Sequence, residues 1–262
     1  MDADERDLLE QVLRKTMTGA SGTAVDASLA DLGWTQMLAE EPGTAIALVF
    51  RLLGETGAHA SVLNDVVLRE AGSPPGRTLA LPYTGGTWVE WTRDGSADGR
   101  VLDPALPLRR VAAGAPVPLA DGRRALGWWL LGSGRAMLAL ARRHVLDRHQ
   151  FGRPLASFQA LRHRLAETYV ALEGAEAALT APGDDDTLAL LAKAAAGRAA
   201  LTAARHCGQA LGGIGFTAEH DLHRHIKRAL VLDGLLGSAR DLTREAGTLL
   251  LREGRTPRLV DL

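Results

Sequence analysis

The chain has 262 residues, of which 46% are hydrophobic and 23% charged, and its net charge is −1. This composition is sufficient for a packed core, and the balanced charge favours neither nucleic acid nor an anionic membrane as a partner. The single cysteine, Cys207, excludes an internal disulfide and a metal site built from several thiolates, so we expect no metal.

The first part of the chain has a helical pattern. Its N-terminus is acidic and polar, which does not fit a signal peptide, and we expect a cytoplasmic protein. Apolar side chains recur at three- and four-residue steps, as on one face of a helix. We expect an N-terminal helical region over residues 1–73, with helices near 5–17, 26–39, 44–54 and 58–72.

The next segment, residues 74–118, predicts a reduced β segment. A cluster of Gly, Ser and Pro at 72–76 ends the helical pattern. Thr, Tyr, Val and Trp on both sides of Gly85 and Gly86 indicate a hairpin, and 106–111 indicates a further strand. The segment is too short for a complete barrel or sandwich.

Residues 119–262 are expected to form an antiparallel four-helix bundle, so the fold class is mainly α. Long helical patterns joined by short links are typical of such bundles. The most apolar run, 125–133, is far shorter than the roughly 18 to 20 residues that a membrane-spanning helix needs. The four predicted helices are 123–148, 155–179, 187–211 and 222–252, the last bent near Gly234 or Gly237.

The first chemical motif is the stretch Arg148-His-Gln-Phe-Gly-Arg-Pro-Leu-Ala-Ser-Phe-Gln159. It places a cation at the end of a predicted helix, just before a glycine that can adopt a left-handed backbone. Pro154 then sets the entry to the next helix. From the residues alone, a purely structural corner between two helices is the favoured explanation of this pattern over a ligand site.

The second motif is Gln209-Ala-Leu-Gly-Gly-Ile-Gly-Phe-Thr217. Adjacent glycines let a backbone approach a phosphate or a sugar closely, although one of them is explained by helix termination. The motif is not a dinucleotide fingerprint, because no strand precedes it and the glycine spacing differs.

Taken together and in this order, the two motifs resemble those of acyl-CoA dehydrogenases. Members carry R-x-x-F-G-x-P-[LI]-x-x-F-Q, then a long helix, then Q-x-x-G-G-x-G-[FY]-T before the last helix. The resemblance covers residues 123–251 well and extends weakly to Leu29–Trp34 and Leu102–Pro104. It implies a flavoenzyme fold with FAD as the cofactor, an acyl-CoA substrate and a possible electron-transfer flavoprotein as electron acceptor.

The resemblance also implies which residues contact the ADP portion of the flavin, commonly the flavin of a neighbouring subunit. A guanidinium complements a pyrophosphate, and a glycine backbone admits it closely. The positions in this sequence are Arg148, Phe158, Gln159, Gln209, Leu211, Gly212 and Gly213.

The chain departs from the family pattern at the catalytic base, because the reaction needs a carboxylate that removes the proton next to the thioester. In many members this is the glutamate of a Tyr-Glu-Gly step on the last helix, which falls on Leu236 here. Other members place it early in the first bundle helix, which falls near Gly122 and Arg123. We therefore assign no catalytic residue, and Asp233, on the same expected helix face as Leu236, and Asp121 are weak substitutes.

Three hypotheses follow. In the first, the chain is the subunit of a heteromeric acyl-CoA dehydrogenase, similar to bacterial enzymes acting on steroid side-chain thioesters, and a full-length homologue supplies the base. In the second, it is a self-sufficient homo-oligomeric enzyme that uses Asp233 or Asp121. In the third, it is a non-enzymatic scaffold of the same fold. The shortened β segment favours the first, because the family's middle β domain normally covers the flavin ring; Trp88 or Trp91 could be its relic or simply core aromatics.

Overall fold

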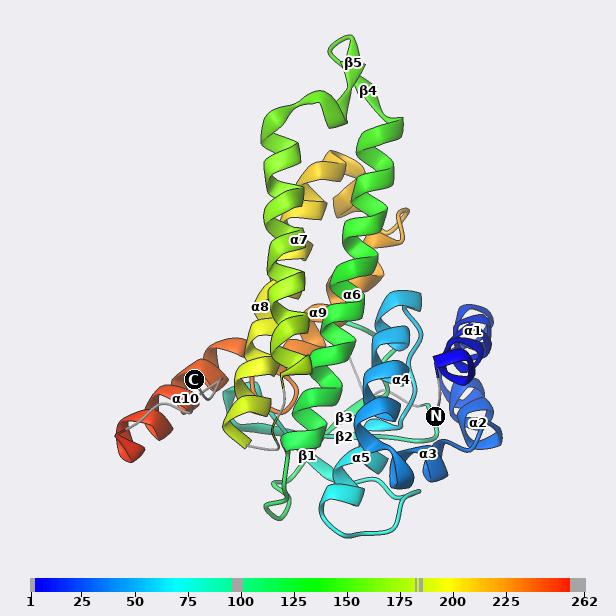
Figure 1. Cartoon of the computed structure of the whole chain (residues 1–262), viewed down its shortest axis with the longest axis vertical. Helices are drawn as coiled ribbons and strands as arrows, with labels where there is room; N and C mark the ends of the chain where they lie inside the picture. Colours follow the sequence, from blue (N-terminus) through cyan, green and yellow to red (C-terminus); the bar gives the residue numbers. More distant parts are fainter. Residues whose placement is uncertain (1–2, 96–100, 182, 184–185, 255–262) are drawn as a thin grey trace.

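The computed structural model describes residues 3–95, 101–181, 183 and 186–254. Its described part is mainly helical, with one small sheet of three strands. Figure 1 shows three long helices, α6, α7 and α8, standing side by side as a column, with the N-terminal helices and the sheet gathered around the lower half of α6. The expected fold class, mainly α with a reduced β segment, is confirmed.

The N-terminal helices pack against the bundle through their fourth member. The seam between α4 and α6 needs glycine on both sides. A Cβ on Gly54 would lie 2.3 Å from the carbonyl oxygen of Trp129, and a Cβ on Gly132 would lie 2.2 Å from that of Arg51. The two backbones are therefore in direct contact. The helices are α1 (Ala3–Gly19), α2 (Thr23–Asp31), α3 (Trp34–Glu40), α4 (Pro42–Thr56) and α5 (Leu63–Glu70).

The single helix predicted for residues 26–39 is wrong, because the structure has two helices there, α2 and α3. Gly33 separates them with a φ of 79°, a left-handed conformation that an α-helix cannot continue through.

The small sheet consists of β1 (Ala80–Tyr83), β2 (Thr87–Trp91) and β3 (Leu108–Val111), all antiparallel, in that order. Its inner face is buried against the helices at Leu81 and Trp91. The Trp91 ring lies 5.5 Å from the Trp129 ring of α6, so this tryptophan is a core residue. The sheet is therefore fixed to α6 through its inner face, and a bridge from Tyr83 to Leu235 joins it to the turn after α9.

The bundle begins with α6 (Ala120–Asp147), α7 (Gln159–Thr180) and α8 (Asp186–Leu211). The last helix expected over residues 222–252 is interrupted where the bend near Gly234 or Gly237 was predicted, but the interruption divides it into two helices. The chain forms α9 (Leu222–Gly234), turns, and leaves as α10 (Ala239–Glu253), which projects sideways from the column (Figure 1). Leu236 lies in the turn with a φ of 57°, a conformation through which an α-helix cannot continue. Ser238 then caps the start of α10 with its side chain.

One large hydrophobic cluster runs through all of these parts, from Leu13 of α1 to Leu236 in the last turn. The helical region, the sheet and the bundle therefore share a core. None of the helices in the described ranges is long and apolar enough to cross a membrane.

Candidate functional site

The first motif forms a tight corner at the upper end of the bundle. Arg148 is the C-cap of α6, and its backbone N–H donates to the carbonyl of His144. The chain then makes a short hairpin of β4 (His149–Gln150) and β5 (Arg153–Pro154) before α7 begins. Phe151 and Gly152 at the hairpin tip have φ values of 56° and 78°. The expected left-handed glycine is confirmed, and a phenylalanine shares its unusual conformation.

The second motif forms the neighbouring corner, where α8 ends. A short 3₁₀ helix, η3 (Gly212–Phe216), follows directly. A Cβ on Gly212 or Gly213 would meet no atom within 4 Å, whereas a Cβ on Gly215 would lie 2.6 Å from the carbonyl oxygen of Gly208. Gly215 is thus needed for packing. The other two glycines leave open space in front of their backbone, as a ligand that approaches the main chain requires.

The two corners line one open cavity of about 450 Å³. Arg148 and Gln150 line it from the first motif, and Gln209, Gly212 and Gly213 line it from the second. The donors are a guanidinium, two side-chain amides and the backbone beside two glycines. This set matches the needs of a phosphate or diphosphate group. The cavity's size suits the nucleotide part of a dinucleotide but not a whole one.

Two helix C-termini meet at this cavity, those of α6 and α8. Their free carbonyl groups carry a partial negative charge that disfavours anions. An anion can bind here only if positive side chains outweigh the partial negative charge of these carbonyls, and Arg148 lines the cavity where it can do so. His144 lines the same cavity from the preceding turn of α6.

The predicted cofactor-binding residues fall into two groups. The structure brings Arg148 together with Gln209, Leu211, Gly212 and Gly213 around the cavity. Phe158 and Gln159 are not in its lining. Phe158 packs against Phe151, with ring centroids 6.0 Å apart, and the Arg153 guanidinium lies 4.2 Å from its centroid. Gln159 is exposed at the start of α7.

The sequence reasoning missed several residues that line the cavity. Gln150 and Leu155 lie inside the first motif, and their place next to Arg148 in a hairpin was the available signal. His144, Leu161, Ala210 and Ile214 carried no motif signal and are brought in by helix geometry alone.

Large apolar side chains are exposed around this end of the bundle. Phe151 is 86% exposed at the hairpin tip and Phe216 is 76% exposed at the end of η3. Exposed aromatic side chains beside a ligand cavity are typical of a surface that another chain covers.

The two positions counted for the missing glutamate meet at one place. Leu236 is 1% exposed, and a Cβ on Gly122 would lie 2.9 Å from its Cδ1 atom and 2.9 Å from a methyl of Val67. The two positions at which family members carry the catalytic glutamate are therefore adjacent in this structure. The leucine side chain fills it, and no carboxylate is inserted there.

The turn that carries Leu236 is held from several sides. The Lys193 side chain is fully buried, and its ammonium donates to the carbonyls of Asp233 at 3.0 Å and Gly237 at 2.5 Å. Burial lowers the pKa of Lys193 to about 7, against the attraction of the Asp233 carboxylate. The N–H of Leu236 donates to the carbonyl of Pro82 at 2.8 Å. This turn is a packed junction between α8, α9, α10 and the sheet.

The two substitute carboxylates have structural partners. Asp233 accepts a hydrogen bond from the N–H of Ala239 at 3.1 Å, and burial raises its pKa. Asp121 is paired with Arg69 at 3.0 Å. The expected shared helix face of Asp233 and Leu236 is wrong, because α9 ends at Gly234 and Leu236 lies in the turn. Both carboxylates stabilise the fold where they are.

His223 and His225, both on α9, do not line the cavity at the two motifs. His223 Nδ1 lies 2.8 Å from the carbonyl of His220. His225 is 5% exposed, and burial lowers its pKa to about 4. Within the described residues, no group of His, Cys, Asp and Glu could hold a metal ion.

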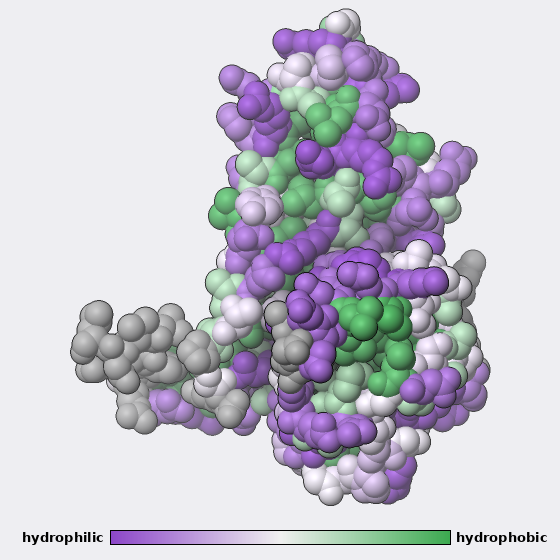
Figure 2. All heavy atoms as spheres, turned by 45° about the vertical axis from the view of Figure 1, so that its right-hand side comes forward, coloured by the Kyte–Doolittle hydropathy of each residue, from purple (hydrophilic) through white to green (hydrophobic). Residues whose placement is uncertain are grey.

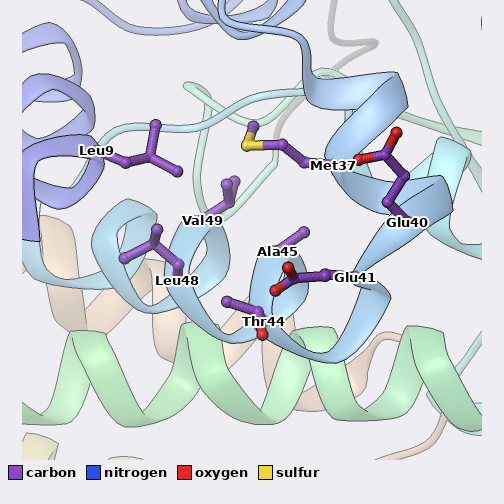
Figure 3. A pocket seen from close by; sticks show the side chains of 8 residues that line it. All are labelled: Leu9, Met37, Glu40, Glu41, Thr44, Ala45, Leu48 and Val49. Carbon is purple, nitrogen blue, oxygen red and sulfur yellow. The ribbon is translucent and has the colours of Figure 1, made fainter. Parts of the chain in front are cut away.

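Two further hollows lie in the lower half of the molecule. Figure 2 shows an apolar surface area in the lower half of the molecule, on the face where the N-terminal helices lie. A cavity of about 280 Å³ lies among α1, α3 and α4, where Leu9, Met37 and Leu48 face one another with Glu40 and Glu41 on the α3–α4 side (Figure 3). A cleft of about 820 Å³ lies between the sheet and Val231 of α9. Neither contains residues of the two motifs.

The family model for the C-terminal domain of acyl-CoA dehydrogenases matches residues 115–240. The acyl-CoA dehydrogenase IpdE2 of Mycobacterium tuberculosis is 31% identical over 258 residues, which covers 89% of this chain and 80% of the relative. The chain belongs to the acyl-CoA dehydrogenase family.

Solved structures share this fold. A chain of the steroid ACAD Tcur3481–Tcur3483 superposes with a TM-score of 0.76 at 19% identity, covering 97% of this chain and 99% of that one. The ChsE4–ChsE5 complex from Mycobacterium tuberculosis gives 0.70 at 16% identity, with 98% and 99% covered. Glutaryl-CoA dehydrogenase from Mycobacterium smegmatis in complex with FADH2 gives 0.71 at 16% identity, with 98% and 97% covered.

Proposed function

We propose that the chain is a subunit of an FAD-dependent, heteromeric acyl-CoA dehydrogenase. It contributes contacts to the ADP portion of FAD and an oligomer interface, and a full-length homologue contributes the base. The observation that carries this proposal is the contrast between the cavity at the two motifs and the expected position of the base. Arg148, Gln209 and Gly212 line an open cavity, while both counted base positions converge on the buried Leu236.

The fit of FAD rests on the cavity itself. Arg148 would pair with the diphosphate, and Gln209 and the backbone at Gly212 and Gly213 would donate hydrogen bonds to it or to the ribose. Phe158 and Gln159 would contact the cofactor from the hairpin side once a second chain closes this end. Bound flavin would supply the hydride acceptor for α,β-dehydrogenation of an acyl-CoA thioester, with an electron-transfer flavoprotein as a possible next acceptor.

A partner is needed for two reasons. The cavity holds the nucleotide part of the cofactor but offers no enclosed place for the ring, and the surrounding Phe151 and Phe216 are exposed. The fold relatives Tcur3481–Tcur3483 and ChsE4–ChsE5 carry paired names, and ChsE4–ChsE5 is described as a complex. The same two-chain arrangement would supply here both the flavin ring site and the missing carboxylate.

The self-sufficient alternative has less support. Asp233 accepts a hydrogen bond at the start of α10, and Asp121 is paired with Arg69. Asp233 lines a hollow of about 470 Å³ between α8 and α10, but this hollow contains no residue of the two motifs. The scaffold alternative predicts that Arg148 does not affect flavin content, which the following experiment tests.

The experiment is co-expression of the chain with a full-length homologue and an absorbance spectrum of the purified assembly. The wild-type assembly should be yellow. Arg148→Ala should weaken FAD binding about tenfold to a hundredfold, since a charged hydrogen bond contributes about 1.5–3 kcal/mol. Arg142→Ala, an exposed arginine on the same helix outside the cavity, is the matched control and should not change flavin content. An assembly that never forms, or that keeps its flavin in Arg148→Ala, contradicts the proposal.

A further inference from the structure

We propose that His144 and His220 extend the diphosphate site and that a proton taken up by His144 strengthens its hold on the dinucleotide. This inference rests on the proposed function, because the same cavity is involved. Its consequence is that cofactor binding by this chain depends on pH in the neutral range.

Two hollows meet at the same two side chains. His144 and Arg148 line the cavity of about 450 Å³ that residues of the two motifs also line. They also line an adjoining hollow of about 370 Å³, whose other walls include Arg143, Asp147 and His220. A diphosphate bound at Arg148 therefore has a second hollow directly beside it, which adds the guanidinium of Arg143 and the imidazole of His220. Neither histidine belongs to the two motifs.

The two histidines have different roles, and the hydrogen bonds distinguish them. His220 accepts the N–H of Leu222 at its Nδ1 atom, at 3.1 Å. Its proton in the neutral form is therefore on Nε2, which makes His220 a donor without any change of charge. No such bond fixes the tautomer of His144 among the described residues. His144 is the group that can gain a proton when an anion arrives.

The charges that face His144 are mostly positive. From its own helix these are Arg143, Arg148 and the opposing Asp147, and the imidazole of His220 faces it from the loop before α9. Burial, then His220 and Arg148, lower the pKa of His144, and Asp147 opposes them. A diphosphate carries two negative charges and would reverse this balance. The pKa of His144 therefore rises on binding, and a proton is taken up.

The position in the fold makes this proton useful. The C-terminal carbonyls of α6 and α8 disfavour an anion at this corner, and they favour a cationic imidazole in the last turn of α6. One guanidinium and one imidazolium together balance the two charges of a diphosphate. As pH rises and His144 loses its proton, this balance is lost and binding weakens.

The test measures the Kd of FAD for the co-expressed assembly from pH 6 to 8.5 after the flavin has been removed. FAD is a suitable probe because its internal diphosphate keeps its charge throughout this range. We expect the wild-type Kd to increase about tenfold, which corresponds to a shift of about one pKa unit on binding. His144→Gln should bind weakly at every pH, and His144→Arg, which carries a permanent cation, should bind tightly at every pH.

The matched control is His163→Gln, an exposed histidine of α7 that lines neither hollow and should keep the wild-type pH profile. A flat wild-type profile, or a profile that His144→Gln leaves unchanged, overturns this inference while Arg148→Ala still weakens binding. If Arg148→Ala also leaves the Kd unchanged, or the wild-type assembly holds no FAD, the proposed function falls as well.

Discussion

Two turns at opposite ends of the bundle share an unusual backbone conformation but differ in their surroundings. Within the described ranges, two residues other than glycine have a positive φ, and one lies at each turn: Phe151 at 56° and Leu236 at 57°. Bulky side chains rarely adopt this conformation, and it persists only where the surroundings enforce it. Both turns are therefore specified closely by their neighbours.

The surroundings of these two turns differ. Phe151 is 86% exposed beside an open cavity with glycines and cations, whereas Leu236 is 1% exposed among apolar atoms and hydrogen-bonded backbone. Under the proposed function, a partner chain and the cofactor complete the upper turn. The lower turn is complete within the chain. Changes at the lower turn should reduce stability, and changes at the upper corner should affect cofactor binding with little effect on stability.

The largest effect expected at the lower turn is that of Lys193→Met. It removes the ammonium that holds two buried carbonyls, which should lower the free energy of unfolding by about 2–4 kcal/mol. Urea unfolding of the variant checks this. Lys15→Met, at an exposed position of α1, is the control and should stay within about 0.5 kcal/mol of wild type. Equal stability of the two variants would show that the turn does not depend on Lys193.

Lys193 also predicts a pH trend. Its pKa is about 7 in the folded chain, lowered by burial, and about 10.4 when unfolded. Between these values the unfolded chain binds more protons, so this lysine makes the free energy of unfolding rise with pH. The advantage of wild type over Lys193→Met should therefore grow from pH 7 to pH 10. A difference that shrinks over this window would contradict the low pKa.

A matched pair of glycine substitutions sharpens the comparison. A Cβ on Gly234 would lie 2.6 Å from the Tyr83 ring, so Gly234→Ala should cost about 1–3 kcal/mol in thermal or urea unfolding. A Cβ on Gly213 meets nothing within 4 Å, so Gly213→Ala should leave stability within about 0.5 kcal/mol. It should still lower the flavin content of the assembly, because the methyl group stands where the ligand approaches. The opposite pattern would remove the distinction between the two turns.

A second pH trend concerns α9, which connects the two regions. The pKa of His225 is lowered to about 4, first by burial and then by Arg224 and Arg228. The unfolded histidine binds a proton near pH 6.5, so stability falls as pH decreases from 6.5 toward 4. His225→Leu should remove most of this loss. Exposed His163→Leu should leave the acid sensitivity unchanged, as measured by melting curves across this range.

The sequence predicted the fold class and the first corner because both depend on local patterns. Apolar periodicity marks α6 and α7, and the glycine and proline of the first motif mark the hairpin. At the break between α9 and α10, the glycines predicted a bend but not two separate helices. The pattern around Leu236 is compatible with a continuous helix, and the hydrogen bonds that enforce the turn come from Pro82 and Lys193, far away in sequence.

The candidate site shows the same limit. Arg148 and Gly212 were found because each lies in a motif, and the structure places both at one cavity. His144 and His220 have no motif and become part of the site only when α6 and the loop before α9 are brought together. The meeting of Gly122 and Leu236 likewise depends on tertiary packing and on no spacing in the chain.

The only cysteine of the chain offers a practical advantage. Cys207 is buried in α8, and burial raises its pKa to about 12, so its thiolate is scarce at neutral pH. A second thiol introduced at the exposed hairpin tip, as in Phe151→Cys, would react with a maleimide dye almost alone. The wild-type background thus permits site-specific fluorescence labelling at the very corner where another polypeptide is expected to dock.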